Sequence, residues 1–197
     1  MDTKPDLSHR LELQRKAFAS DRFPDLKTRI GRIERLLEMT RKNARSIAEA
    51  ICADFGNRSP YETLVSELMQ LESAVRHTRK HLGRWMRPRR RATGLLYFPA
   101  SNVLQPQPLG VVGIIGAWNY PFQLSVSPAM EALAAGNRVM IKTSELAPRF
   151  AALLAQLIRE EFDESLLTVV EGDAAVAAAF AALPFDHLLF TGSTRVG

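Results

Sequence analysis

The fold class is most evident from residues 111–145, "VVGIIGAWNYPFQLSVSPAMEALAAGNRVMIKTSE". It contains two short apolar runs, at residues 111–115 and 138–142, and a helical pattern over residues 127–137 between them. Each apolar run has the length of a buried strand. Two strands joined by a helical crossover pair in parallel, because the helix carries the chain back to the edge where the first strand began. The stretch therefore predicts a strand–helix–strand unit of a parallel sheet.

The same alternation continues to the end of the sequence. A helical pattern over 147–162 precedes an apolar run at 166–170, and a helical pattern over 173–183 precedes another run at 187–190, which we expect to be a buried strand. The last residues, "TGSTRVG", are typical of a turn that opens a further helix. The predicted fold class is therefore α/β, with N-terminal helices followed by an incomplete doubly wound parallel sheet.

The first ninety residues are predicted to be helical. Apolar residues at spacings of three and four from Leu26 to Ile51 predict one long amphipathic helix, which Gly56 closes. Ser59 has the properties of an N-cap, so a second helix should begin there and run into a basic block. The apolar, proline-broken sequence from 94 to 109 instead predicts extended segments at the edge of a sheet.

The formal net charge of +5 is concentrated in that basic block. Residues 76–91 hold eight Arg and Lys, and no Asp or Glu occurs between Glu72 and Glu131. Such a block binds polyanions, including nucleic acid, or it is a solvated helix end whose cations suit the helix dipole. We favour the second interpretation and expect no nucleic-acid partner, since no nucleic-acid-binding motif accompanies the block.

Composition also restricts the class of protein. No apolar run approaches the roughly eighteen residues of a membrane span, and the N-terminus is too polar for a secretory signal. The single cysteine, Cys52, excludes an intramolecular disulfide, and the four histidines are scattered. We therefore expect a cytoplasmic protein without a metal site or a membrane anchor.

Polar residues follow the strands at the edge where open parallel sheets bind ligands. Lys142 ends one strand and Glu145 lies three residues later, so an amine and a carboxylate share this edge. The carboxylate can accept hydrogen bonds from a ribose. The same two residues also fit a lysine that caps strand carbonyls and a glutamate in the first turn of a helix. The motif alone leaves both interpretations open.

Two more turns follow predicted strands. Gly192 permits close backbone approach and Ser193 can cap a helix, as in a phosphate cradle. Gly-Ser-Thr is also an ordinary turn, however, and the sequence has neither G-x-G-x-x-G nor a P-loop motif. Asn119, in "GAWNYPF", could donate its amide to a developing oxyanion. Alternatively, Asn119 only forms the turn before Pro121.

Three motifs in series resemble the aldehyde dehydrogenase superfamily: "PLGVVGIIGAWNYPF", "ALAAGNRVMIKTSE" and "LLFTGSTRVG". The resemblance covers essentially the whole chain and is strongest to the branch of class 3-type and coniferyl aldehyde dehydrogenases. It implies a Rossmann-like cofactor domain that serves the oxidation of an aldehyde, aromatic or of medium length, to a carboxylic acid with NAD or NADP. It also implies a homodimer or higher homo-oligomer.

The resemblance assigns roles to individual residues. Asn119 corresponds to the family's oxyanion donor, and Lys142 and Glu145 correspond to the residues that hold the adenosine ribose. Gly192 and Ser193 correspond to a turn beside the pyrophosphate. The approach of cofactor and substrate would be lined by Ile115, Gly116 and Trp118.

The resemblance places the rest of the family's catalytic machinery outside this sequence. The nucleophilic cysteine and the base glutamate lie beyond the Gly-Ser-Thr turn, so we expect the front part of an aldehyde dehydrogenase that is inactive alone. Residues 1–93 would be the helical part of the cofactor domain, 94–109 the start of a subunit-pairing hairpin, and 110–197 the nucleotide-binding layer. The alternative is a non-catalytic module that binds nucleotide or assembles with full-length subunits.

Overall fold

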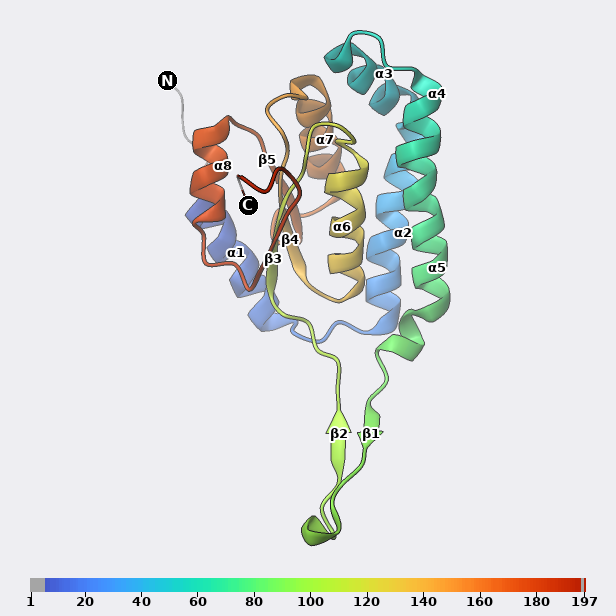
Figure 1. Cartoon of the computed structure of the whole chain (residues 1–197), viewed down its shortest axis with the longest axis vertical. Helices are drawn as coiled ribbons and strands as arrows, with labels where there is room; N and C mark the ends of the chain where they lie inside the picture. Colours follow the sequence, from blue (N-terminus) through green and yellow to red (C-terminus); the bar gives the residue numbers. More distant parts are fainter. Residues whose placement is uncertain (1–5, 196) are drawn as a thin grey trace.

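The computed structural model describes residues 6–195 and 197, and shows an α/β body from which a hairpin projects (Figure 1). The helices and helical turns are α1 (Leu7–Ser20), α2 (Leu26–Lys42), α3 (Ala44–Phe55), α4 (Pro60–Thr63), the π-helical turn η1 (Leu64–Leu68), α5 (Met69–Trp85), the 3-10 turn η2 (Leu95–Tyr97), α6 (Gln123–Ala134), α7 (Pro148–Glu161) and α8 (Ala174–Ala181). The strands are β1 (Arg89–Arg91), β2 (Asn102–Leu104), β3 (Val111–Ile115), β4 (Arg138–Lys142), β5 (Leu167–Val170) and β6 (His187–Phe190).

The central sheet has the strand order β5-β4-β3-β6, and all its pairs are parallel. Helices α6 and α7 cover one face, with α2, α3 and α5 packed outside them, whereas α1 and α8 lie on the other face (Figure 1). Covering both faces buries β3 and β4 almost completely, as parallel sheets require. The predicted α/β class and parallel pairing are confirmed.

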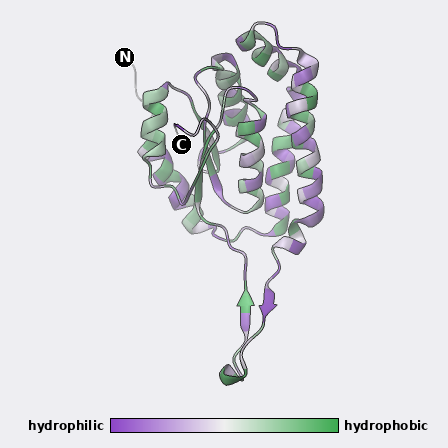
Figure 2. Ribbon diagram, in the orientation of Figure 1, coloured by the Kyte–Doolittle hydropathy of each residue, from purple (hydrophilic) through white to green (hydrophobic). Residues whose placement is uncertain are grey.

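The outer helices are amphipathic, as their apolar spacing predicts. Figure 2 shows hydrophobic residues on the central strands and α6, whereas α2 and α5 alternate between hydrophobic and hydrophilic residues. Ile33 and Leu36 on α2 and Leu71 on α5 are fully buried in the main hydrophobic core. The outer helices therefore hold α6 and α7 against the sheet mainly by apolar contact.

Two predicted helix boundaries are wrong. The long helix is divided between α2 and α3 at Asn43, which leaves helical geometry (φ −111°, ψ 13°) and donates its side-chain amide to the Met39 carbonyl, at 2.9 Å. An asparagine that bonds local backbone in this way competes with helix continuation. Helix α6 begins at Gln123, about one turn before the predicted start, so Pro128 lies inside it.

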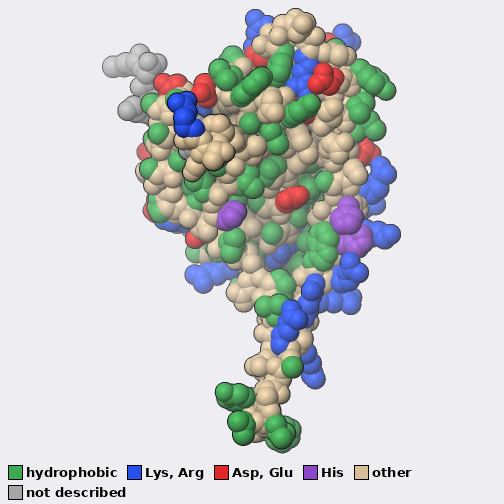
Figure 3. Space-filling view, in the orientation of Figure 1, with side chains coloured by type: hydrophobic (Ala, Val, Ile, Leu, Met, Phe, Trp, Pro, Cys, Tyr) green, Lys and Arg blue, Asp and Glu red, His purple; other side chains and the backbone are tan. Residues whose placement is uncertain are grey.

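The extended edge segment predicted within residues 94–109 is confirmed at β2, which is an edge strand of a separate two-stranded sheet. Strands β1 and β2 pair antiparallel, with Arg90 opposite Val103, and extend away from the body (Figure 1). Figure 3 shows Arg and Lys side chains along the stem and α5, and hydrophobic side chains at the tip. The first arm of the hairpin lies within the basic block. The domain boundaries at 93 and 109 stay a prediction.

Strand β6 is more exposed than predicted. Leu188, at its centre, is 38% exposed. The reason is its place in the sheet, because β6 pairs with β3 on one side and forms the sheet edge. An apolar run of four residues does not distinguish a central strand from an edge strand.

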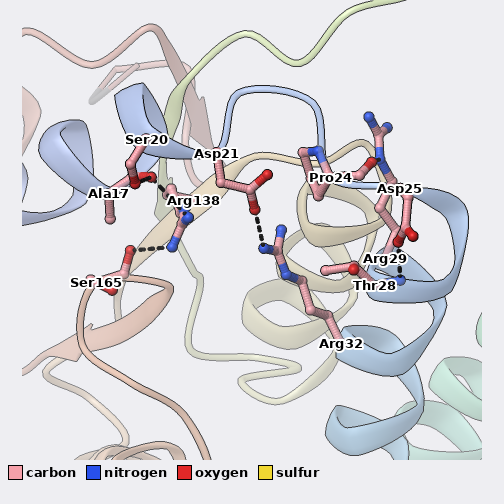
Figure 4. A network of polar contacts seen from close by, with 10 residues as sticks. All are labelled: Ala17, Ser20, Asp21, Pro24, Asp25, Thr28, Arg29, Arg32, Arg138 and Ser165. Atoms are coloured by element: carbon pink, nitrogen blue, oxygen red, sulfur yellow. Dashed lines mark hydrogen bonds and ion pairs between the residues drawn. The ribbon is translucent and has the colours of Figure 1, made fainter.

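Buried arginines tie the helices to the amino ends of the strands (Figure 4). Arg138, the first residue of β4, donates to the carbonyls of Ser165 at 3.1 Å and Ala17 at 3.0 Å. Arg29 donates to the carbonyl of Ala135 at 2.7 Å, which joins α2 to the residue after α6. These bonds fix the amino ends of the strands to the helices around them. None of the helices within residues 6–195 is both long and apolar enough to span a bilayer.

Candidate functional site

A cavity of about 740 Å³ lies at the carboxyl ends of β3, β4 and β6. It is where open parallel sheets bind ligands. All the residues predicted from the sequence line it, namely Ile115, Gly116, Trp118, Asn119, Lys142, Glu145, Gly192 and Ser193. The structure therefore brings together residues that are up to 78 positions apart, 193 minus 115, in the sequence.

The register of the sheet explains this convergence. Ile115 lies opposite Lys142 on one side and Phe190 on the other, so the three strands end at the same level. Two backbone bonds extend the pairing by one residue, from Gly116 N to the Lys142 carbonyl and from Thr191 N to the Ile115 carbonyl, each at 3.0 Å. The residues that follow each strand consequently face one space.

The other wall of the cavity was not predicted as part of the site. It is formed by α8, and its lining residues are Ala174, Ala177, Ala178 and Ala181. The alanine bias of this helix is visible in the sequence, and small side chains leave room for a bound molecule. That signal is weak, because alanine-rich helices also cover sheets closely without binding anything.

Lys142 is buried and already engaged by the backbone. Its Nζ donates to the carbonyls of Thr143 at 2.5 Å and Gly172 at 2.8 Å. Burial lowers the pKa of Lys142 from its ordinary value, while the charges of Glu145 and Asp173 oppose that shift. An ammonium has three N–H donors, so one remains for a ligand. The structure thus accommodates both the carbonyl-capping role and a ligand-binding role.

Glu145 and Asn119 present exposed side chains to the cavity. The Glu145 carboxylate is an acceptor near the Lys142 amine, as the ribose-binding interpretation requires. The main-chain carbonyl of Asn119 accepts a hydrogen bond from Arg58 Nη1 at 2.5 Å. The side-chain amide of Asn119 takes no part in that contact. Its role as an oxyanion donor and its role as a turn former therefore both stay predictions.

Two glycines are required by close packing around the cavity. A Cβ at Gly116 would lie 2.1 Å from Ser125 Oγ, and a Cβ at Gly192 would lie 2.3 Å from Cζ of Phe190. Neither position accepts a larger residue without movement of a neighbour. Glycine at these two positions therefore lets the backbone pack closely against Ser125 and Phe190.

The N-termini of two sheet-covering helices are occupied by carboxylates from the helical layer. Glu67 Oε2 accepts from the amides of Phe122 at 2.8 Å and Gln123 at 3.1 Å, at the start of α6. Asp54 likewise accepts from the amides of Arg149 and Phe150, at 3.0 and 2.9 Å, at the start of α7. These helix ends therefore already hold an anion of the protein itself.

Sequence reasoning missed these carboxylates because they are separated from their partners by 55 to 96 positions. The amides that they bind at the starts of α6 and α7 are therefore already engaged. No group of three or more His, Cys, Asp or Glu suited to a metal ion occurs in the part of the chain that the structure describes.

Comparisons with known proteins agree with this geometry. The chain matches the model of the "Aldehyde dehydrogenase family" over residues 2–197. A probable coniferyl aldehyde dehydrogenase of Pseudomonas aeruginosa is 46% identical over 184 residues, which cover 93% of this chain and 39% of that protein. The predicted resemblance is confirmed, and the chain spans about two fifths of the length of this relative.

Solved structures give the same result. Substrate-bound AldH of Staphylococcus aureus superposes with a TM-score of 0.91 at 32% identity, covering 97% of this chain and 42% of that chain. The indole-3-acetaldehyde dehydrogenase AldA of P. syringae, in complex with NAD+ and IAA, superposes with a TM-score of 0.82 at 25% identity, covering 98% of this chain and 39% of that chain.

Proposed function

The chain belongs to the aldehyde dehydrogenase family, and from this we propose that it forms the cofactor-binding part of an enzyme that oxidises an aldehyde to a carboxylic acid with NAD or NADP. The observation that carries the proposal is the convergence on one cavity of every site residue predicted from the motifs. A nicotinamide cofactor, when bound, accepts the hydride removed from the aldehyde.

The residues of the cavity fit a dinucleotide. The remaining donor of Lys142 and the exposed carboxylate of Glu145 would hold the adenosine ribose. By family resemblance, the backbone at Gly192 and Ser193, which line the same cavity, would lie beside the pyrophosphate. The walls at Ile115, Gly116 and Trp118 would exclude water from the approach to the reacting atoms.

Asn119 is the residue of this chain that would act on the reaction itself. Its amide would donate a hydrogen bond to the oxygen on which negative charge develops when a nucleophile attacks the aldehyde carbonyl. By family resemblance, the attacking cysteine and the base glutamate belong to the longer protein. The P. aeruginosa relative is named for coniferyl aldehyde, so we propose an aromatic aldehyde of that kind as substrate.

The longer protein would be a cytoplasmic homo-oligomer that uses the hairpin of β1 and β2 in subunit pairing. A non-catalytic nucleotide-binding or assembly module is the alternative. Aldehyde-dependent NADH formation and size-exclusion chromatography, performed on the 197-residue chain and on the full-length protein, distinguish the two. An inactive full-length protein would favour the module.

The test of the site uses the full-length protein with coniferyl aldehyde. Asn119→Ala should lower kcat about a hundredfold, as expected for the loss of one oxyanion donor, and should leave the NAD affinity unchanged. Glu145→Gln should instead lower the ratio of NAD to NADP use, because the carboxylate that repels a 2′-phosphate is lost. Glu49, exposed on α3, supplies the matched control Glu49→Gln. Normal turnover of Asn119→Ala would reduce that residue to a turn former.

A further inference from the structure

Arg58 and Glu67 form a buried ion pair behind the loop that carries Asn119. Arg58 Nη2 lies 3.1 Å from Glu67 Oε1, and the two side chains are 4% and 0% exposed. Arg58 lies between α3 and α4, and Glu67 lies in η1, so both come from the helical layer. Such a pair loses its hydration on folding, and apolar residues of similar volume are often equally stable in its place. Stability alone is therefore a weak explanation for it.

The Arg58 guanidinium holds the loop directly. Its Nη1 donates to the main-chain carbonyl of Asn119 at 2.5 Å. The same group lies over the rings of Phe55 and Tyr120, at 4.9 and 4.6 Å from their centroids. Phe55 in turn contacts Trp118, with 6.0 Å between ring centroids. Each of the three successive loop residues is thus held by Arg58 or by a ring that Arg58 contacts.

Glu67 holds the other end of the loop. While Oε1 faces Arg58, Oε2 accepts from the amides of Phe122 and Gln123, where the loop enters α6. Burial raises the pKa of Glu67, and the hydrogen bond from Gln123, the charge of Arg58 and the hydrogen bond from Phe122 oppose that shift. Glu67 lies in η1, a π-helical turn, and such turns occur frequently at functional sites.

We propose that Arg58 and Glu67 are positioning residues that fix the direction in which the side-chain amide of Asn119 points at the cavity. Arg58 donates to the main-chain carbonyl of Asn119, and Glu67 accepts from the amides of Phe122 and Gln123, where the loop ends. Neither residue lines the cavity, so both act through the backbone. The inference rests on the proposed role of Asn119 as oxyanion donor. It adds that this role depends on an ion pair from the helical layer.

The test is a double-mutant comparison in the full-length protein, with Arg58→Met and Glu67→Gln each made alone and in the Asn119→Ala background. Alone, each should lower kcat about tenfold or more, because the donor is misplaced, while the NAD dissociation constant stays unchanged. In the Asn119→Ala background, each should cause almost no further loss, because the donor that they position is already gone. Arg58→Lys, which retains the charge, should recover part of kcat. Arg45→Met, which removes an exposed pair with Glu49, is the matched control.

The outcomes separate this inference from the proposed function. If Asn119→Ala itself leaves kcat unchanged, the oxyanion role fails and the positioning role fails with it. If Asn119→Ala lowers kcat but Arg58→Met and Glu67→Gln do not, or lower it equally in both backgrounds, only the positioning role is overturned. Glu67→Gln is nearly isosteric and keeps an acceptor for the two α6 amides, so it remains informative if Arg58→Met does not fold.

Discussion

Replacing Gly116 by alanine tests whether the end of β3 is as tightly packed as the structure shows. The added Cβ would lie 2.1 Å from Oγ and 3.2 Å from Cβ of Ser125, a buried residue of α6. The shorter distance is far inside van der Waals contact, so the Ser125 hydroxyl must rotate or α6 must shift. Gly116 N also pairs with the Lys142 carbonyl at 3.0 Å, which prevents the strand from moving freely.

Overpacking of this kind costs about 1 to 3 kcal/mol, and we expect Gly116→Ala to lower the free energy of unfolding by about 2 kcal/mol. Removing the hydroxyl with Ser125→Ala leaves the 3.2 Å contact, which a small shift relieves. The double variant Gly116→Ala with Ser125→Ala should therefore recover more than half of the loss. Urea unfolding followed by far-ultraviolet circular dichroism measures the free energy of unfolding of the wild type, the two single variants and the double variant.

Gly31 supplies the matched control, since a Cβ there meets no atom within 4 Å and the residue lies inside α2. Gly31→Ala should raise the free energy of unfolding by about 0.5 to 1 kcal/mol, because alanine favours the helix. The packing argument would be refuted if Gly116→Ala unfolded at the wild-type urea concentration. A double variant no more stable than Gly116→Ala would refute the assignment of the clash to Ser125.

Three further predictions concern stability and activity. Asp54→Ala leaves two amides of α7 without an acceptor and should cost about 1 to 2 kcal/mol in urea unfolding, whereas Glu49→Ala on the exposed face of α3 should cost at most about 0.5 kcal/mol. Because the folded-state pKa of Lys142 is lowered, the unfolded chain binds more protons than the folded chain between that pKa and 10.5. The stability of wild type relative to Lys142→Met should therefore rise with pH across this interval in urea titrations, and a flat difference would contradict the shift. The purified 197-residue chain should form no NADH from an aldehyde, since its only cysteine, Cys52, lies on α3 and does not line the cavity; turnover that persists in Cys52→Ser would overturn the family mechanism for this chain.

The parallel sheet and the positions of the candidate site residues follow from the sequence alone. Apolar runs of four or five residues alternate with helical patterns, and this alternation is a local property that the tertiary structure does not change. Strands that run in parallel end at one edge, so Lys142 at the end of β4 and Gly192 just after β6 were predictable at the same edge of the sheet. The same reasoning placed Asn119 after β3 and therefore at the same edge.

The long-range contacts that support that edge depend on how the elements pack together. Strand β6, for example, is half exposed because it pairs with β3 alone. Arg58 and Glu67 occur in a sequence that predicts only helix and turn, yet folding brings both against a loop more than fifty residues away. Periodicity reports which face of an element is buried. It contains no information on which distant backbone amide or carbonyl that face will meet, because such partners are set by how the helical layer packs against the sheet.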